Sequence, residues 1–123
     1  MIVDASGFIK VIKLGKVEKL REPKTTRLIF YELGNVLWKE SKIFKRFSPA
    51  EAQAMLKDWI LWIGCNFDIY EPDWHATLGI ALNTGLSYYD ASYLWLAKKV
   101  NEPIVTADKD LKKYWKAVDF KRL

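Results

Sequence analysis

The sequence predicts an α/β fold in which a central parallel β-sheet of four to five strands is flanked by helices on both faces. Two observations support this fold class. Short apolar runs of strand length are interspersed with longer segments whose apolar residues repeat at helical spacing. The chain has 123 residues, enough for one hydrophobic core and too few for two domains of ordinary size, so we expect a single domain over residues 1–123.

The first part of the chain predicts a strand, a helix, and then a second strand or a helix start. Residues 2–6 form a short buried strand, and the apolar spacing after it predicts a helix from residue 8 to Gly15. Thr25 and Thr26 mark either the edge of a strand or the entry to a helix. The pattern beyond them predicts a helix that continues toward Phe47.

The segment that begins at Ser48 predicts the start of another helix. Ser48 suits the N-cap, Pro49 suits the first helical position, and Glu51 can complete a capping box. We expect Gly64 to end this helix. Its apolar face is wider than one core contact requires, so it either meets another chain or is fully buried in the protein's own core.

Three strands and three helices are expected in the rest of the chain. The strands are residues 67–70, 103–106 and 117–120, and the helices are residues 72–85, 87–100 and 108–115. Ser87 and Asp108 are the expected N-caps of the last two helices. Strands joined by helices in this way pair in parallel.

The chain is basic, with a formal net charge of +5 and a pI near 9.3, which favours encounter with a polyanion such as nucleic acid. Between Lys10 and Arg27 there are seven basic residues and only two acidic ones. Such a run is either a solvated face or a path for phosphate groups. Half of the residues are hydrophobic and 28% are charged, which is a globular composition and not a disordered or fibrous one.

A single Cys and a single His restrict the chemistry. Cys65 has no partner for an intrachain disulfide, and we expect it to be a small buried residue in a reducing, cytoplasmic setting. His75 lacks the further His or Cys ligands of a zinc site, so we expect a structural or surface role. There is no Gly-rich phosphate loop. Neither a secretory signal nor a membrane-spanning segment is expected.

Four acidic residues are expected at one edge of the sheet. Asp4 ends the first strand, and Asp108 follows a later strand by two residues. Asp90 and Glu32 lie in or near the first turns of helices. Because sites in parallel sheets form outside the carboxyl ends of the strands, these four acids should converge.

Two of these acids lie on helix faces that are normally buried. Asp90 shares its face with Tyr93 and Leu94, and Glu32 has Asn35 as the one polar side chain nearby at helical spacing. Burying an unpaired carboxylate is costly, so a cation or extensive hydrogen bonding is expected beside them. A set of oxygen ligands favours Mg²⁺ or Mn²⁺ over zinc.

Each acid also has a purely structural explanation. Asp108 suits a helix N-cap, Asp90 suits the reciprocal acid of a capping box with Ser87, and Asp4 suits a turn at the end of a strand. The expected convergence of all four acids favours a functional site over these separate roles.

The acids lie in motifs that together resemble the PIN-domain family, particularly the VapC toxins of VapBC toxin-antitoxin pairs. The motifs follow the order of that family and span nearly the whole chain. They are Met1-Ile-Val-Asp4-Ala-Ser6, Tyr31-Glu32-Leu-Gly-Asn35-Val-Leu, Tyr89-Asp90-Ala-Ser-Tyr93-Leu and Val105-Thr106-Ala-Asp108-Lys-Asp110-Leu.

The resemblance implies a PIN-like three-layer fold and an endoribonuclease that depends on Mg²⁺ or Mn²⁺. The residues that it implicates fall into two groups. Asp4, Glu32, Asp90 and Asp108 match the catalytic acids, and Ser6, Asn35, Thr106 and Asp110 match supporting positions. In the implied mechanism Asp4, Asp90 and Asp108 hold the metal, which activates a water, and Glu32 orients that water or binds a second ion. Asp110 matches an acid that only some members of the family have.

The resemblance also implies partners: an RNA substrate, a second copy of the chain in a homodimer, and an antitoxin that covers a hydrophobic groove and blocks the acidic site. A second possibility stays open, a non-catalytic module of the same fold that binds RNA or protein. Phosphotransfer enzymes with acids at a sheet edge are disfavoured, because the haloacid-dehalogenase pattern requires an Asp where this chain has Ser6.

Overall fold

The structure is a computed structural model that describes residues 1–123, and it contains one sheet of four parallel strands. The strands are β1 (Ile2–Val3), β2 (Lys24–Thr26), β3 (Asp68–Tyr70) and β4 (Ile104–Val105). Their order across the sheet is β3-β2-β1-β4, so β1 lies between β2 and β4. The sheet is short, and its carboxyl ends all lie at the same edge.

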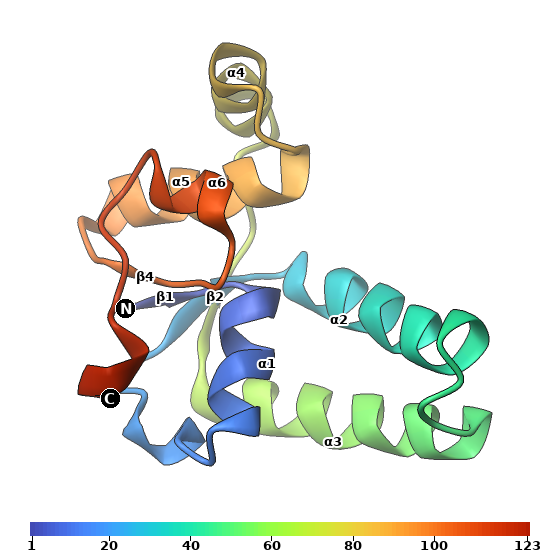
Figure 1. Ribbon diagram of the computed structural model, residues 1–123. Helices are drawn as coiled ribbons and strands as arrows, with labels where there is room; N and C mark the ends of the chain where they lie inside the picture. The colour runs from blue at the N-terminus through green and yellow to red at the C-terminus, as the bar shows by residue number, and fades with distance from the viewer.

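Six α-helices surround the sheet. They are α1 (Ala5–Lys13), α2 (Ile29–Trp38), α3 (Pro49–Asn66), α4 (Trp74–Thr84), α5 (Tyr88–Val100) and α6 (Lys109–Lys112). Figure 1 shows α5 and α6 on one side of the sheet and α1 and α3 on the other, with α4 projecting beyond α5. A π-helical turn (Lys39–Ile43) and two 3-10 turns (Val17–Lys19 and Phe120–Arg122) complete the chain. The three-layer α/β fold predicted from the sequence is therefore confirmed.

The first helix begins earlier than the sequence pattern predicts. The predicted strand over residues 2–6 ends at Val3, and α1 starts at Ala5. The cause is Asp4, whose backbone is extended and whose carboxylate accepts a hydrogen bond from the Gly7 backbone N–H. This side chain caps the helix, so that strand and helix are joined by a single residue.

The prediction that Gly64 ends the long helix is wrong. The capping box of Ser48 and Glu51 is present, but α3 continues through Gly64 to Asn66. Gly64 does not have a positive φ, so it keeps the backbone of an ordinary helical residue. Cys65, expected to be buried, is exposed near this end of α3.

The C-terminal segment also differs from the prediction. The helix that begins after Asp108 ends at Lys112 and does not reach residue 115. The fifth strand, expected over residues 117–120, is reduced to a single bridge between Ala117 and Ile104. Asp119 stops further pairing, because its side chain accepts a hydrogen bond from the Lys121 N–H and starts a 3-10 turn.

The core lies on both faces of β1 and β4. Ile2, Val3 and Val105 have no exposed surface. On the α1 side, the ring of Phe8 meets Trp59 at 5.8 Å and Trp62 at 6.4 Å between ring centroids. The wide apolar face of α3 is thus packed partly against the protein's own core. Elsewhere on α3 apolar side chains are exposed. None of the helices is both long and apolar enough to cross a membrane.

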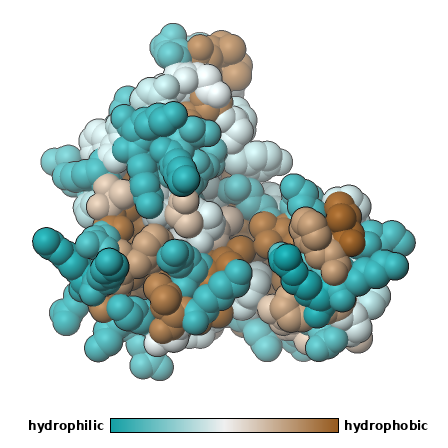
Figure 2. Space-filling view, in the orientation of Figure 1, coloured by the Kyte–Doolittle hydropathy of each residue, from teal (hydrophilic) through white to brown (hydrophobic).

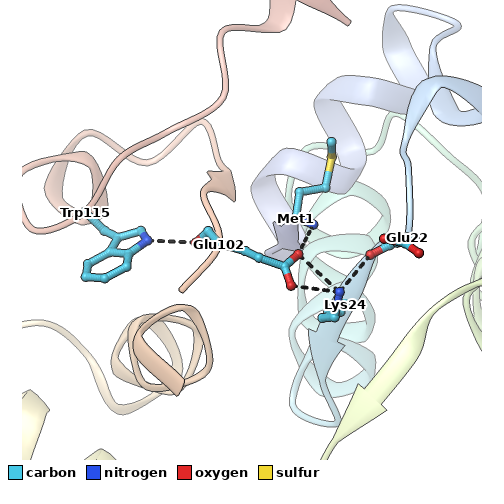
Figure 3. Close-up of polar contacts among 5 residues, drawn as sticks. All are labelled: Met1, Glu22, Lys24, Glu102 and Trp115. Atoms are coloured by element: carbon cyan, nitrogen blue, oxygen red, sulfur yellow. Dashed lines mark hydrogen bonds and ion pairs between the residues drawn. The ribbon is translucent and has the colours of Figure 1, made fainter. Parts of the chain in front are cut away.

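A polar network holds the amino ends of the central strands together (Figure 3). The Glu102 carboxylate, just before β4, accepts hydrogen bonds from the Met1 amine at 2.5 Å and from the Lys24 ammonium of β2. These bonds lower the pKa of Glu102. The Glu102 carbonyl accepts a further bond of 2.8 Å from the Trp115 indole N–H. The network lies at the edge of the sheet opposite the four acids, so it fixes the strands without occupying the site.

Gly7 is the closest contact between α1 and β4. A Cβ atom at this position would lie 1.9 Å from the carbonyl oxygen of Val105. This distance is shorter than any real contact, and the obstacle is backbone that cannot rotate away. Gly7 therefore lets the start of α1 approach the end of β4.

We expect Gly7→Ala to lower the free energy of unfolding by about 3 kcal/mol or more, because α1 must move off the sheet. Urea unfolding followed by circular dichroism measures this. Gly64→Ala is the matched control, since nothing lies within 4 Å of its added Cβ, and we expect it to stabilise the protein by about 0.5 to 1 kcal/mol. Equal stability of the two variants would contradict the proposed contact.

Candidate active site

All four predicted acids lie at the carboxyl edge of the sheet, and each stands at the start of a helix. Asp4 is the N-cap of α1 and Asp108 is the N-cap of α6. Glu32 lies in the first turn of α2, and Asp90 lies in the first turn of α5. The positive ends of four helix dipoles therefore face this region, and they stabilise negative charge there.

Asp4 is the most buried acid and is held by three hydrogen bonds. Its Oδ1 accepts from the Ser6 hydroxyl at 2.8 Å and from the Gly7 N–H at 2.7 Å. Its Oδ2 accepts from the Thr106 hydroxyl at 2.5 Å. A carboxylate has about four lone-pair positions, so one position on Oδ2 is left for another partner.

The hydroxyls of Ser6 and Thr106 also fix the loop that carries Asp108. The Ser6 oxygen lies 3.2 Å from that of Thr106 and accepts a 3.0 Å bond from the Ala107 N–H. The Thr106 oxygen accepts a 3.0 Å bond from the Asp108 N–H. The structure thus brings both residues to Asp4, where they join β1 to the end of β4.

Glu32 is paired with a residue that the sequence reasoning did not assign to the site. The Tyr93 hydroxyl on α5 donates a 2.6 Å hydrogen bond to Oε1 of Glu32 on α2. Tyr93 has no exposed surface, and a buried Tyr hydroxyl almost always has a hydrogen-bond partner. The sequence could have pointed to Tyr93, because a Tyr on the buried face of the helix that carries Asp90 needs a polar partner for its hydroxyl.

Asp90 faces Asp108. The negative charge of Asp108 adds to the effect of burial in raising the pKa of Asp90. Asp90 does not complete a capping box with Ser87; the Ser87 hydroxyl only accepts from the Asp90 N–H, at 3.1 Å. Asp108 does cap its own helix, since its Oδ1 accepts from the Asp110 N–H at 2.8 Å. Asp108 is therefore both the N-cap of α6 and a member of the acid cluster.

Asn35 and Asp110 lie outside this hydrogen-bonded cluster. Asn35 is exposed on α2, and its side chain makes no hydrogen bond, although it lines a hollow with Glu32. Asp110 is exposed, and its carboxylate pairs with the Lys113 ammonium at 3.4 Å. Neither residue contacts Asp4.

The cluster is electrostatically strained because its carboxylates are buried together. Burial raises the pKa of Asp4 from 3.8 to about 6, against the opposing effect of its hydrogen bonds. Burial likewise raises the pKa of Glu32 from 4.5 to about 7, and the charges of the other three acids add to this. The pKa of Asp90 is raised by burial and then by the charge of Asp108. No Lys or Arg forms an ion pair with any of the four acids.

The donor set suits a hard divalent cation better than any other metal. It consists of carboxylate and hydroxyl oxygens, and the only His, His75, stacks edge-on against Trp74 on α4. Burial is the main cause that raises the pKa of Asp4 and of Glu32, and a cation beside them would favour their ionised forms. As the side chains stand, however, no three of them form a ready set of metal ligands. The oxygen atoms of the site therefore suit a divalent cation.

The sequence matches a known protein family. The model of the PIN domain matches residues 1–116, which is nearly the whole chain. The chain belongs to the PIN-domain family.

Two curated relatives of this PIN domain come from Pyrobaculum aerophilum. One, named exonuclease VapC9, is 36% identical over 113 residues, which are 89% of this chain and 81% of the relative. The other, named ribonuclease VapC3, is 30% identical over 96 residues, which are 77% of this chain and 72% of the relative. The crystal structure of PAE2754 from the same organism superposes with a TM-score of 0.76 at 27% identity, covering 98% of this chain and 89% of that one. The chain is thus a VapC-type PIN domain.

The raised pKa of Glu32 predicts a pH-dependent loss of stability in the metal-free protein. Below pH 4.5 the Glu32 carboxyl is protonated in both the folded and the unfolded state, so it does not lower the free energy of unfolding. Between pH 4.5 and about 7 it ionises in the unfolded state and stays protonated in the folded state, so the free energy of unfolding falls. We expect Glu32→Gln to be increasingly stable relative to wild type between pH 5 and pH 8 in EDTA. Urea unfolding at several pH values measures this.

Glu18→Gln is the control for that experiment, because Glu18 is an exposed acid away from the cluster. The difference in unfolding free energy between this variant and wild type should stay constant across the same pH range. If Glu32→Gln also shows a constant difference, Glu32 is not a destabilised buried acid.

Proposed function

We propose that this PIN domain is a metal-dependent endoribonuclease, and that it is the toxin of a type II toxin-antitoxin pair. The observation that supports this best is the cluster of four buried or half-buried carboxylates with no basic partner. The names of the relatives, exonuclease VapC9 and ribonuclease VapC3, agree in nuclease chemistry; the first names attack at a strand end and the second names RNA as the substrate.

Asp4, Asp90 and Asp108 are the proposed ligands of Mg²⁺ or Mn²⁺. Asp4 has one free lone-pair position on Oδ2, and the carboxylates of Asp90 and Asp108 would supply the other ligand oxygens. When bound, the cation supplies charge neutralisation at the phosphate and a more acidic water. Ser6 and Thr106 keep the Asp4 carboxylate oriented toward this position.

Glu32 is the proposed group that positions the attacking water. Its carboxylate is held by the Tyr93 hydroxyl through one oxygen, which leaves the other oxygen to accept a hydrogen bond from water. A pKa of about 7 lets it take up a proton near neutral pH. Attack by water at phosphorus breaks the bond from phosphorus to the 3′-oxygen, which leaves and takes up a proton, so that the products are a 5′-phosphate and a 3′-hydroxyl. His75 and Cys65 are both exposed and take no part.

Partners of this domain are proposed from its exposed apolar surface. A hollow of about 280 Å³ between α1, α2 and α3 is lined by Ile9, Val36, Met55 and Trp59, and it suits an antitoxin segment. Figure 2 shows hydrophobic surface in this part of the molecule and at the projecting helix α4. On α4, Leu82 is 76% exposed, which suits a homodimer contact. We place the protein, with its RNA substrate, in the cytoplasm.

Asp4→Asn should lower the rate of RNA cleavage by about 100-fold or more, because it removes one charge from the metal ligands without changing the side-chain shape. Cleavage of a circular RNA with Mg²⁺ or Mn²⁺ measures this and separates the two modes of attack, since only an endonuclease opens a circle. Asp58→Asn, an exposed acid on α3, is the matched control and should retain full activity.

A companion measurement is the binding of Mn²⁺ by calorimetry, which does not require a substrate. Wild type should bind the ion, and Asp4→Asn should bind it about 10- to 100-fold more weakly. Cleavage that is equal in wild type and Asp4→Asn would contradict the proposed site. No cleavage of any RNA with either cation would favour a non-catalytic binding module instead.

A further inference from the structure

A second hollow, of about 280 Å³, lies directly beside Glu32. It is lined from α2 by Tyr31, Glu32, Asn35 and Val36, from the π-helical turn that continues α2 by Lys39, and from the start of α5 by Tyr89. Two of its lining residues immediately precede site acids in the sequence, Tyr31 before Glu32 and Tyr89 before Asp90. The hollow is thus contiguous with the acid cluster, although the chemistry proposed above uses only Glu32 among its residues.

Three of the lining residues follow one face of α2 and of the π-helical turn that continues it. Tyr31, Asn35 and Lys39 are spaced by four residues each, so their side chains lie above one another on successive turns. This face presents an aromatic ring, a carboxamide and an ammonium group in that order, starting at the acid site. Tyr89 adds a second ring from α5.

None of these four side chains has a role within the protein. Tyr31 is 66% exposed and Tyr89 is 45% exposed, although large aromatic side chains usually contribute to a core. The side chains of Tyr31, Asn35, Lys39 and Tyr89 make no hydrogen bond or ion pair. Their faces, donors and acceptors are therefore free to bind a ligand.

The four groups match the parts of one nucleotide. Exposed Tyr rings provide stacking surfaces for an unpaired base, and a carboxamide hydrogen-bonds to the edge of a base. An ammonium group pairs with a phosphate. The volume is near the lower limit of small-molecule sites, which suits a single base and not a longer segment.

We propose that this hollow is a nucleobase-binding subsite, in which a base next to the cleaved phosphate stacks on Tyr31 and Tyr89. Asn35 hydrogen-bonds to the edge of that base, and Lys39 pairs with a neighbouring phosphate. The proposal rests on the ribonuclease function proposed above. A base within a duplex is already stacked and paired, so the subsite admits only an unpaired nucleotide.

The test compares Tyr31→Ala, Tyr89→Ala and the conservative Tyr31→Phe and Tyr89→Phe variants on an unstructured single-stranded RNA. Each Ala variant should lower kcat/KM by about fivefold to about 150-fold, the range expected for the loss of one base-aromatic stack. Each Phe variant keeps the ring and should stay within about twofold of wild type. Trp38→Ala is the matched control, an exposed aromatic on α2 that lines a different hollow.

A binding measurement in EDTA tests the subsite without cleavage. Fluorescence anisotropy of a labelled single-stranded RNA should show weaker binding by both Ala variants and unchanged binding by Trp38→Ala. The slope of log K against log salt is negative, and Lys39→Ala should make it less steep by about 0.7, the value for one phosphate contact on a single strand. These results support the subsite even if no RNA is cleaved, so they separate it from the nuclease proposal.

Two results would overturn the subsite. In the first, wild type cleaves RNA and both Ala variants cleave and bind it as well as wild type does. The nuclease proposal then stands and the subsite proposal fails. The other is a change of oligomeric state in the Ala variants, measured by analytical ultracentrifugation, because the hollow would then be covered by a second copy of the chain.

Discussion

The site depends on the burial of one carboxylate at the junction of three elements. Asp4 ends β1, caps α1 and is bonded to Thr106 at the end of β4. The close contact of Gly7 with the Val105 carbonyl brings these elements near enough for those bonds to form. Burial then disfavours the ionised form of Asp4, and the charge of Asp108 disfavours it further. The same packing that stabilises the fold therefore creates a region that favours a cation.

Much of this arrangement is predictable from local sequence. Strand and helix spacing gives the fold class, and the Ser48 capping box and the Ser87 N-cap place two helices correctly. The acids could be placed at one edge because each lies near the end of a strand or the start of a helix, and parallel strands share a direction. These properties depend on neighbouring residues, which the sequence shows directly.

The properties that were missed depend on contacts between distant residues. Tyr93 and Glu32 are 61 positions apart, so their hydrogen bond follows only from the packing of α5 against the rest of the fold. The predicted end of α3 at Gly64 was wrong because a Gly inside a helix need not end it, and the strand expected over residues 117–120 was wrong because Asp119 starts a 3-10 turn there. Asn35 and Asp110 fit sequence motifs, but both are exposed and neither side chain hydrogen-bonds to Asp4.

Because all four acids of the cluster lie at the start of a helix, the site should tolerate changes at the far ends of those helices. A residue at the first turn is fixed by the strand or loop before it, not by the number of turns that follow. Helices in this protein can therefore lengthen, shorten or exchange their outer surfaces at their far ends without moving a carboxylate. Insertions are best accommodated at those distal ends, such as the exposed turn between α2 and α3.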